Sequence, residues 1–348
     1  MTPPVRRLYD FLSGFYDEQE MSVLKSQIFS WGEATTSPLR GKHILDGTPI
    51  FRNTMLKYCA LLAAGAEVTA STGEGIPCDK EILKILPDFG IRVADAAALA
   101  ETYDAISDCG GRHRHVSSRT GYVELTRTGL EYYRNCPQPV IDVDSSVFKD
   151  FETTYGTGDG FVRAMRQAGY SDFADKRLLV FGGGKVGLGI AGRALRAGAS
   201  VTVVDLKRPA LLDERIEFIP AAETENVLTA ITKAWCVVSA TGIAGALAKW
   251  ADALASSSAV IANMGVEDEY SPALPSERVL NGKAPLNFIL EEPTRLRFIA
   301  PAMAMCNESL RFLLSGRELP PGLQEPPREV SMEMLLNLAK TGIVLNRD

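Results

Sequence analysis

The glycine-rich segment near the middle of the chain constrains the fold more than any other feature. The apolar run Leu178–Phe181 leads directly into Gly182-Gly-Gly-Lys-Val-Gly187, and a helix-like stretch then continues to Ala197. Thr202-Val-Val-Asp205 follows with the composition of a second strand. A strand, a G-x-G-x-x-G turn, a helix and a strand ending in an acidic residue are typical of the parallel α/β unit that binds a dinucleotide. The segment therefore predicts a doubly wound parallel sheet.

Each position of this turn has a physical role. Gly182 permits the tight bend, Gly184 lets a pyrophosphate approach the backbone, and Gly187 lets the helix pack closely on the strand. The helix N-terminus, at Lys185 and Val186, offers unpaired N–H groups and a partial positive charge to the phosphates. The alternative is a glycine-rich turn that binds no nucleotide.

Residues at the ends of other predicted strands complete the expected cofactor site. Asp205 is expected to accept hydrogen bonds from the adenosine ribose and to repel a 2′-phosphate, which favours NAD over NADP. Lys207 and Arg208 weaken that preference. Ala240-Thr241-Gly242 and Asn263 follow two further predicted strands, so we interpret them as cofactor contacts at the same sheet edge. An ordinary strand-to-loop turn explains either of them equally well.

A second α/β pattern precedes the glycine-rich unit. A strand from His43, a helix over Asn53–Ala64 and a strand over Glu67–Ser71 alternate as in parallel winding. Prolines and glycines between residues 137 and 160 interrupt the pattern, and we place a hinge there. We predict two Rossmann-like α/β domains with doubly wound parallel sheets and a cleft between them. Residues 1–150, joined by C-terminal helices of 310–348, would form the substrate domain, and residues 151–309 the NAD-binding domain.

Composition excludes several classes of function. The chain carries 37 Lys plus Arg against 43 Asp plus Glu, a formal charge of −6, whereas a general nucleic-acid binder needs a basic surface. The six cysteines stand far apart without zinc-like spacing, so we expect reduced thiols and no metal site. No window reaches the roughly 20 apolar residues of a membrane span, and no secretory signal is evident. We expect a cytoplasmic protein that acts on a small molecule as a symmetric dimer.

Several segments resemble one known family. Val180-Phe-Gly-Gly-Gly-Lys-Val-Gly-Leu-Gly-Ile-Ala191 resembles the NAD domain of the S-adenosylhomocysteine hydrolases, with their G-x-G-x-V-G-x-G-x-A pattern. Weaker likenesses extend, patchily, from about residue 43 to about residue 310. Leu61–Val68 resembles the first βα unit of that family, and Asp108-Cys109-Gly-Gly111 resembles its Asp-Asp-Gly-Gly turn. Thr120-Gly121 resembles its Thr-rich nicotinamide loop, and Val140–Ser146 resembles its hinge segment. Ala240-Thr-Gly242 resembles its Thr-Thr-Gly segment. The resemblance implies a two-domain NAD enzyme.

The chain departs from that family where the family carries out its chemistry. The resemblance aligns Pro49 with a histidine, Cys109 with an aspartate, Ser117 with a glutamate, Phe148 with the catalytic lysine and Val266 with a second histidine. Retained NAD groups with altered substrate groups argue against adenosylhomocysteine hydrolysis. The NAD-dependent amino-acid dehydrogenase of pyrrolysine biosynthesis is a distant relative on the same architecture, and it favours an amino-acid-like substrate.

A basic tetrapeptide, Arg112-His113-Arg114-His115, follows the predicted Asp108 turn. If that turn lines the cleft, as the resemblance implies, Arg112 with Arg114 or Arg119 would bind an anionic substrate, and His113 or His115 would serve as the acid/base. Neighbours in an extended segment face opposite sides, so at most part of this set faces inward. The alternative is a solvated basic loop.

Four further residues are weaker candidates. Lys149 would act as a base if a one-residue shift placed it where Phe148 aligns, and the alternative is a surface lysine. Glu152 would orient a substrate hydroxyl or the nicotinamide ribose. Asp108 and Cys109 would contact the substrate, and Cys109 is either a nucleophile or a small buried turn residue.

The leading hypothesis is an NAD-dependent dehydrogenase that oxidises or reduces a small anionic amino or hydroxy substrate in a specialised biosynthetic pathway. The first alternative is an adenosylhomocysteine hydrolase or nucleoside-processing variant that uses NAD transiently. The second is a non-catalytic NAD-binding regulatory protein. NADH formation with a panel of substrates, adenosine release, or bound NAD without turnover separates the three.

Overall fold

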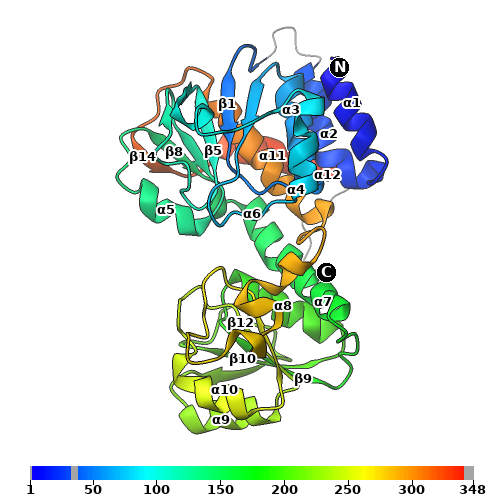
Figure 1. Ribbon diagram of the computed structural model, residues 1–348, viewed down its shortest axis with the longest axis vertical. Helices are drawn as coiled ribbons and strands as arrows, with labels where there is room; N and C mark the ends of the chain where they lie inside the picture. Colours follow the sequence, from blue (N-terminus) through cyan, green and yellow to red (C-terminus); the bar gives the residue numbers. More distant parts are fainter. Residues whose placement is uncertain (1, 33–37, 341–348) are drawn as a thin grey trace. The chain divides into compact units, whose positions relative to one another are not determined.

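Two compact units divide the chain. The computed structural model describes residues 2–32 and 38–340. One unit comprises Met1–Asp150 and Leu296–Asp348, and the other comprises Phe151–Arg295. Each contains a parallel sheet with helices beside it (Figure 1), so the prediction of α/β, Rossmann-like folding with parallel sheets is confirmed.

The first unit is built on a seven-stranded sheet in which every pairing is parallel. Its strand order is β14-β8-β7-β5-β1-β2-β3. The chain runs outward from β1 to β3 and then returns to the other side of β1 as β5, so the topological switch point lies between β1 and β5. The strands are β1 (His43–Asp46), β2 (Glu67–Ala70), β3 (Arg92–Val93), β5 (Ala105–Asp108), β7 (Tyr122–Glu124), β8 (Pro139–Asp142) and β14 (Gly322–Gln324).

Helix α11 (Leu296–Leu313) completes the core of this unit. It packs against α2 and α3, and its residues from Ala300 to Leu310 are buried. The chain therefore returns to the first unit at Leu296, earlier than the expected residue 310, because this apolar helix fills the first core. The other helices are α1 (Pro3–Leu12), α2 (Glu18–Gly32), α3 (Leu56–Ala63), α4 (Lys80–Ile85), α5 (Arg127–Tyr133) and α12 (Arg328–Lys340), and β4 (Thr102–Tyr103) pairs with β6 (Ser117–Ser118).

The second unit holds a five-stranded parallel sheet of order β11-β10-β9-β12-β13. Alternate residues of β9 enter different cores, Val180 with α7 and α8 and Leu179 with α9 and α10, as a doubly wound sheet requires. The switch point lies between β9 and β12. The elements are β9 (Arg177–Phe181), β10 (Ser200–Asp205), β11 (Glu217–Pro220), β12 (Cys236–Ser239), β13 (Val260–Asn263), α7 (Thr157–Gln167), α8 (Lys185–Arg196), α9 (Thr224–Lys233) and α10 (Ala251–Ser256).

An uninterrupted helical run crosses from one unit to the other. It consists of α6 (Val147–Phe151), a π-helical turn (Glu152–Gly156) and α7. We predicted that the glycines of this region break the regular pattern, and this is wrong for Gly158, which lies inside α7. A side chain at Gly158 would overlap the backbone of Gly189 in α8, so the glycine permits close helix packing.

Two searches of the described residues bear on membranes and metals. None of their helices combines the length and apolar character needed to cross a bilayer. The same residues contain no group of three or more His, Cys, Asp or Glu arranged to hold a metal ion. All six cysteines are free.

Candidate functional site

The glycine-rich turn joins β9 to α8 at the carboxyl edge of the second sheet. Gly182 has a φ of +101°, in the region that favours glycine, and a side chain there would overlap the carbonyl group of Ala240. A Cβ at Gly187 would overlap the carbonyl oxygen of Gly182. Gly184 is the N-cap of α8, and a Cβ there would meet no atom within 4 Å. The turn itself requires Gly182 and Gly187, whereas Gly184 keeps the space before the helix open.

Replacing Gly184 by alanine tests that open space. Its φ of −76° suits alanine, so we expect unchanged thermal stability. The dissociation constant for NAD should rise about 10- to 100-fold, which corresponds to losing one hydrogen bond to a charged pyrophosphate. Gly192→Ala, also in open space on α8, is the matched control and should bind NAD normally. Equal titration curves for both variants would contradict the assignment.

Asp205 ends β10 beside the turn. Its Oδ2 accepts the Gly183 N–H at 2.5 Å and its Oδ1 accepts the Leu206 N–H at 2.5 Å. A carboxylate has about four acceptor sites, so capacity remains for ribose hydroxyls. Lys185 and Val186, both half-buried, begin α8 next to it.

Exposed apolar side chains gather on the same edge of the second sheet. Leu206 follows β10, Ile243 follows β12 and Val266 follows β13, and each is more than half exposed, at 82%, 62% and 66%. Apolar surface beside a polar turn marks a ligand site. Together with the open N-terminus of α8 and the Asp205 carboxylate, these side chains fit a dinucleotide with flat ring systems.

The loop after β12 is held by a glutamate that the sequence analysis did not single out. Glu269 is fully buried, and its Oε2 accepts both the N–H and the hydroxyl of Thr241 at 2.8 Å. Its Oε1 accepts the Gly242 N–H at 2.7 Å. Ala240, which is buried, lies against Gly182. Ala240–Gly242 thus borders the glycine-rich turn, with its donors already bound to protein.

Asn263 has a structural role. The side chain is fully buried, and its Oδ1 accepts the Ser239 hydroxyl at 2.9 Å and the Gly265 N–H at 3.0 Å. Its Nδ2 donates to the carbonyl oxygens of Gly265, Glu267 and Lys283. We predicted a cofactor contact here, but the polar atoms of Asn263 are already bonded to the protein.

In the first unit, Ser71, His113 and Asp108 form a continuous hydrogen-bonded chain. His113 Nδ1 lies 2.8 Å from Asp108 Oδ1, and its Nε2 lies 2.8 Å from Ser71 Oγ. The three residues Ser71, His113 and Asp108 are 3%, 2% and 0% exposed. Asp108 ends β5 and Ser71 follows β2, so the chain lies at the carboxyl edge next to the switch point. Because a carboxylate only accepts, Nδ1 donates to Asp108 and a neutral imidazole offers its Nε2 lone pair to Ser71.

Asp108 is held in one orientation. Its Oδ1 also accepts the Cys109 N–H at 2.8 Å, and its Oδ2 accepts the His113 N–H at 2.9 Å and the Tyr133 hydroxyl at 2.6 Å. Burial and the neighbouring Asp108 raise the pKa of Tyr133 far above its usual range, so this phenol stays a donor. A side chain at Gly47, just after β1, would overlap the His113 ring. The imidazole is therefore fixed in both tautomer and position.

Glu124, the last residue of β7, organises the double-glycine turn before His113. Its Oε1 accepts the Gly110 N–H at 2.9 Å, its Oε2 accepts the Gly111 N–H at 3.0 Å, and Thr126 donates its hydroxyl at 2.7 Å. Burial, with the nearby Asp108 charge, raises the pKa of Glu124 to about 7. A carboxyl group that titrates near neutrality thus holds the loop that carries the histidine.

The pKa of Glu124 predicts a pH dependence of stability. Its folded value of about 7 exceeds the ordinary value of 4.5, so the folded protein binds more protons between these limits. The free energy of unfolding therefore falls as pH rises through this window, by about 3 kcal/mol in total. Urea unfolding at about pH 5 and about pH 7.5 should show a smaller fall for Glu124→Gln than for wild type. Glu131→Gln, an exposed control on α5, should match wild type, and equal falls in all three proteins would refute the assignment.

A buried ion pair lies at the end of β1. Lys57 Nζ is 2.6 Å from Asp46 Oδ2, and both side chains are 2% exposed. The Tyr58 hydroxyl donates to Asp46 Oδ2 at 2.6 Å, and Thr48, which also contacts Lys57, donates to Oδ1 at 3.1 Å. These polar atoms bond to one another and pin α3 to the end of β1.

The basic tetrapeptide divides between the inside and the outside of the first unit. His113 is buried, while Arg112, Arg114 and His115 are exposed. Arg114 lies 4.4 Å from the Tyr132 ring and donates to the Gly111 carbonyl at 2.8 Å. Arg112 lies against the loop after Ser71, and no hydrogen bond or ion pair joins its guanidinium to another described residue. Arg112 is thus an exposed cation of this loop whose guanidinium is not bound to another described residue.

Comparison with known proteins places the chain among its relatives. The family described as "Putative NAD(P)-binding" matches residues 170–275, which include β9 to β13. The adenosylhomocysteinase of Thermoplasma acidophilum is 27% identical over 259 residues, or 66% of this chain and 62% of that protein. The chain is thus distantly similar to the adenosylhomocysteinases. Its second unit is an NAD(P)-binding domain.

A second curated protein and a solved structure are also similar to this chain. The adenosylhomocysteinase of Thermococcus kodakarensis is 28% identical over 213 residues, or 52% of this chain and 50% of that protein. The chain thus matches between half and two thirds of the length of these adenosylhomocysteinases. A dipicolinate synthase subunit from Bacillus halodurans, known as a crystal structure, is 14% identical with a TM-score of 0.51, and the match covers 80% of this chain and 99% of that one. That likeness concerns the fold.

Arg119 and Thr120 lie away from His113. Arg119 Nη1 is 3.4 Å from Asp104 Oδ1, and the Thr120 hydroxyl donates to the Asp104 carbonyl at 2.6 Å. Asp104 precedes β5 and Asp108 ends it, about 13 Å farther along the strand. We predicted substrate and nicotinamide contacts for Arg119 and Thr120 near the Asp108 turn, but the structure places both at the amino edge of the sheet.

The remaining candidates differ in their surroundings. Cys109 is buried, and burial raises the pKa of its thiol well above the usual value, which removes it as a nucleophile. Lys149, half-buried in α6, lies close enough to oppose that rise electrostatically. Glu152 belongs to the second unit, where it accepts the hydroxyls of Thr153 at 3.1 Å and Thr294 at 3.4 Å. The structure therefore brings Lys149 near the Asp108 turn.

The sequence analysis missed Ser71, Glu124 and Thr126 as members of this edge. A usable signal was present for Ser71, which ends the predicted strand Glu67–Ser71, whereas Glu124 and Thr126 follow a strand that is too short to recognise from the sequence. The carboxyl ends of parallel strands meet at one edge of a sheet. Glu269 offered no such signal, since it lies well beyond the end of β13.

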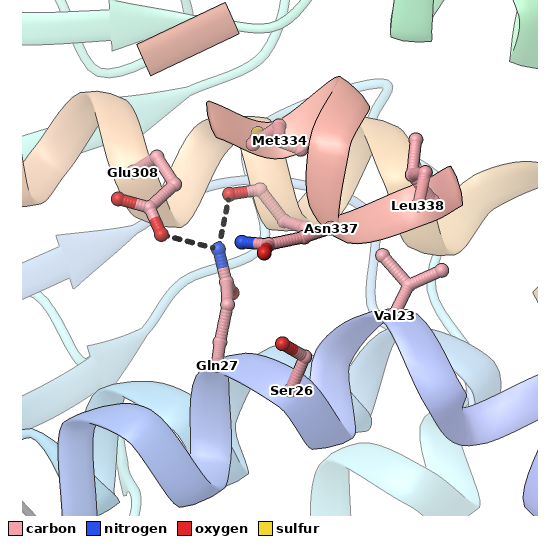
Figure 2. Close-up of a pocket in the computed structure, with 8 residues that line it drawn as sticks. Val23, Ser26, Gln27, Glu308, Met334, Asn337 and Leu338 are labelled. Atoms are coloured by element: carbon pink, nitrogen blue, oxygen red, sulfur yellow. Dashed lines mark hydrogen bonds between the residues drawn. The ribbon is translucent and has the colours of Figure 1, made fainter. Parts of the chain in front are cut away.

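Two hollows in the structure lie elsewhere. The first unit has a cavity of about 20 Å³, and its lining includes Gln27, which donates to Glu308 at 3.1 Å. Figure 2 shows Met334 and Leu338 of α12 on the opposite side from Gln27. This volume suits one water molecule. A groove of about 470 Å³ in the second unit runs along α9 and the strands β9 to β11, and its lining includes Glu217 and Lys233. Neither hollow includes a candidate site residue.

Proposed function

We propose that the chain is an NAD-dependent oxidoreductase that acts on a small anionic amino or hydroxy substrate. The observation that carries this proposal is the buried Asp108–His113 pair, 2.8 Å apart, in a chain whose other unit is an NAD(P)-binding domain. Oxidation of an alcohol or amine releases a proton along with the hydride, so the reaction needs a positioned base. His113 fits that task because Asp108 fixes its tautomer and stabilises the imidazolium that forms.

The chain's own residues divide the work. The glycine-rich turn and Asp205 hold NAD, which supplies the hydride acceptor when it is bound. His113 takes the proton of the substrate hydroxyl or amine at Nε2 and returns it in the reverse reaction. Arg112, exposed beside the loop after Ser71, binds the carboxylate or phosphate of the substrate as a bidentate donor.

Purified full-length protein tests this function. NAD is supplied with a panel of small amino and hydroxy acids, and NADH is followed by its near-ultraviolet absorbance. Turnover with an anionic substrate, lost on Arg112→Leu through a raised KM, supports the proposal. Arg119→Leu is the matched control, since this arginine lies at the opposite edge of the sheet and is paired with Asp104. Bound NAD without NADH formation across the panel would favour a regulatory protein instead.

Adenosylhomocysteine hydrolysis is the second candidate, because the matched curated relatives carry that name. The positions that the resemblance aligns with that family's catalytic groups argue against it, since Phe148 is fully buried and Pro49 and Val266 carry no titratable group. Adenosine release from adenosylhomocysteine, followed by chromatography, decides between the two. We also expect a symmetric dimer in the cytoplasm, which light scattering and cell fractionation would check.

A further inference from the structure

We propose that Ser71 is the nucleophile of an acyl-transfer site, at which the protein cleaves an ester or thioester of a small anionic acid. This activity goes beyond hydride transfer and needs no nucleotide. A base for dehydrogenation requires His113 and Asp108, but it does not require a serine hydroxyl at His113 Nε2. The proposed dehydrogenation therefore does not explain why Ser71 is hydrogen-bonded to His113.

The three residues have the roles that nucleophilic catalysis by serine needs. His113 Nε2 lies 2.8 Å from Ser71 Oγ, within reach to take its proton. Asp108, fully buried, receives the other ring nitrogen at 2.8 Å and is itself held by Tyr133. A serine, a histidine and a carboxylate joined in this order recur on unrelated folds, and they are recognised by geometry and not by chain position.

Donors for a developing oxyanion lie next to the serine in the chain. Ser71 follows a strand, and the residue after a nucleophile in that setting supplies one N–H of the oxyanion hole. The N–H groups of Thr72 and Gly73 form no hydrogen bond within the described part of the chain, whereas the N–H of Ser71 donates to the Asp46 carbonyl at 2.8 Å. Ser71 is 3% exposed and the loop from Thr72 to Gly75 is largely exposed, so this loop must move for an acyl group to enter.

The charge near Ser71 selects the acyl group. Arg112 packs against Gly73 and approaches Gly75, the two glycines of the loop after Ser71. Its guanidinium has no protein partner among the described residues and is free to bind a second, anionic group of the substrate. We therefore expect dicarboxylic half-esters or half-thioesters to react faster than neutral esters of the same length.

The reaction balances without an oxidant or a reductant. Ser71 Oγ attacks the acyl carbon while its proton passes to His113 Nε2. The carbon–oxygen or carbon–sulfur bond to the leaving group breaks, and His113 returns the proton to that oxygen or sulfur. Water then attacks the acyl-serine, gives one proton to His113 and displaces Oγ, which recovers its proton. The sum is ester plus water giving acid plus alcohol, or the thioester equivalent.

The test uses the full chain, without nucleotide, in two assays. A fluorophosphonate probe is added and the labelled peptide is identified by mass spectrometry, and hydrolysis of p-nitrophenyl acetate and of p-nitrophenyl hydrogen succinate is followed in parallel. We expect the probe on Ser71 and faster hydrolysis of the succinate. Ser71→Ala should lose the label and reduce hydrolysis to the buffer rate. His113→Gln should label about 10²- to 10⁴-fold more slowly.

Ser107→Ala is the matched control. Ser107 is equally buried, in strand β5 of the same sheet, but its hydroxyl has no hydrogen-bond partner among the described residues, so the variant should label like wild type. Thermal unfolding of each variant confirms that it is folded. An unlabelled Ser71 in wild type, or Ser71→Ala that hydrolyses the esters at the wild-type rate, would overturn the proposal. Because the assay contains no NAD, its result does not depend on whether the oxidoreductase activity exists.

Discussion

His113→Gln should lower the turnover of the proposed oxidoreductase by about 10²- to 10⁴-fold, the usual contribution of a positioned acid/base. Glutamine can keep a hydrogen bond to Asp108 but cannot take a proton. NADH binding, measured by fluorescence, should stay at the wild-type value, because the glycine-rich turn belongs to the other unit. Steady-state rates with the best substrate of the panel measure the effect.

His115→Gln provides the matched control for this experiment. His115 stands two positions along the same loop, but it is exposed, whereas His113 is 2% exposed and bonded to Asp108. We expect turnover of His115→Gln within about twofold of wild type, since exposed substitutions rarely change the local structure. Comparable losses in the two variants would show that the basic loop acts as a whole, and full activity of His113→Gln would refute its role.

Lys57→Met should cost about 3–5 kcal/mol of folding free energy. The substitution removes one partner of an ion pair whose side chains are both 2% exposed, and so leaves the Asp46 carboxylate buried without its counter-charge. Guanidinium unfolding followed by circular dichroism measures the loss. Lys84→Met, an exposed lysine on α4, should change stability by less than about 0.5 kcal/mol.

The double variant Asp46→Asn/Lys57→Met separates the missing charge from the missing packing. With both charges gone, asparagine still accepts from Tyr58 and Thr48, and methionine fills most of the lysine volume. Replacing a whole buried pair is often neutral, so we expect the double variant to recover more than half of the loss. If the double variant is as unstable as Lys57→Met, the cost comes from packing and not from an uncompensated charge.

The sequence predicted the second sheet closely because its strands are local apolar runs. The expected strand Leu178–Phe181 differs by one residue from β9, and β12 ends directly before Ala240, as expected. In a doubly wound sheet both faces of these strands are covered, so the apolar pattern is continuous and easy to recognise. The glycine-rich turn was equally easy to recognise from the sequence, because one strand and the helix that follows it determine the spacing of its glycines.

Elements that depend on distant partners were missed. Gly322–Gln324 stands in a proline-rich stretch, yet it forms β14 by pairing with β8, which is far away in the sequence. Tyr122–Glu124 is too short to be recognised as a strand from the sequence, and its pairing with β5 and β8 determines its extended conformation as β7. Tertiary contact outweighs local propensity in such short segments.

The same limit applies to the candidate site of the first unit. His113 was a candidate from its basic neighbourhood, but nothing local connects it with Ser71, which follows another strand. The sequence placed His113 close to the Asp108 turn, but it gave no sign of the other contacts. These are the packing of Gly47 against the His113 ring and the hydrogen bond from Tyr133 to Asp108. Conversely, the position of Asn263 at a strand end predicted a cofactor contact. In the structure its side-chain amide group donates to three backbone carbonyl groups instead.

The route of the chain through α11 has a consequence for synthesis on the ribosome. The second unit is contiguous, from Phe151 to Arg295, whereas the first is closed by a helix that begins only at Leu296. The first 150 residues therefore leave the ribosome before α11, the helix on which their own helices pack, has been synthesised. They cannot complete their core until the NAD(P)-binding unit has been made. The second unit can therefore fold before the first, although it is encoded later. In a nascent chain halted near Arg295, the NAD(P)-binding unit should be folded while the first unit is still incomplete.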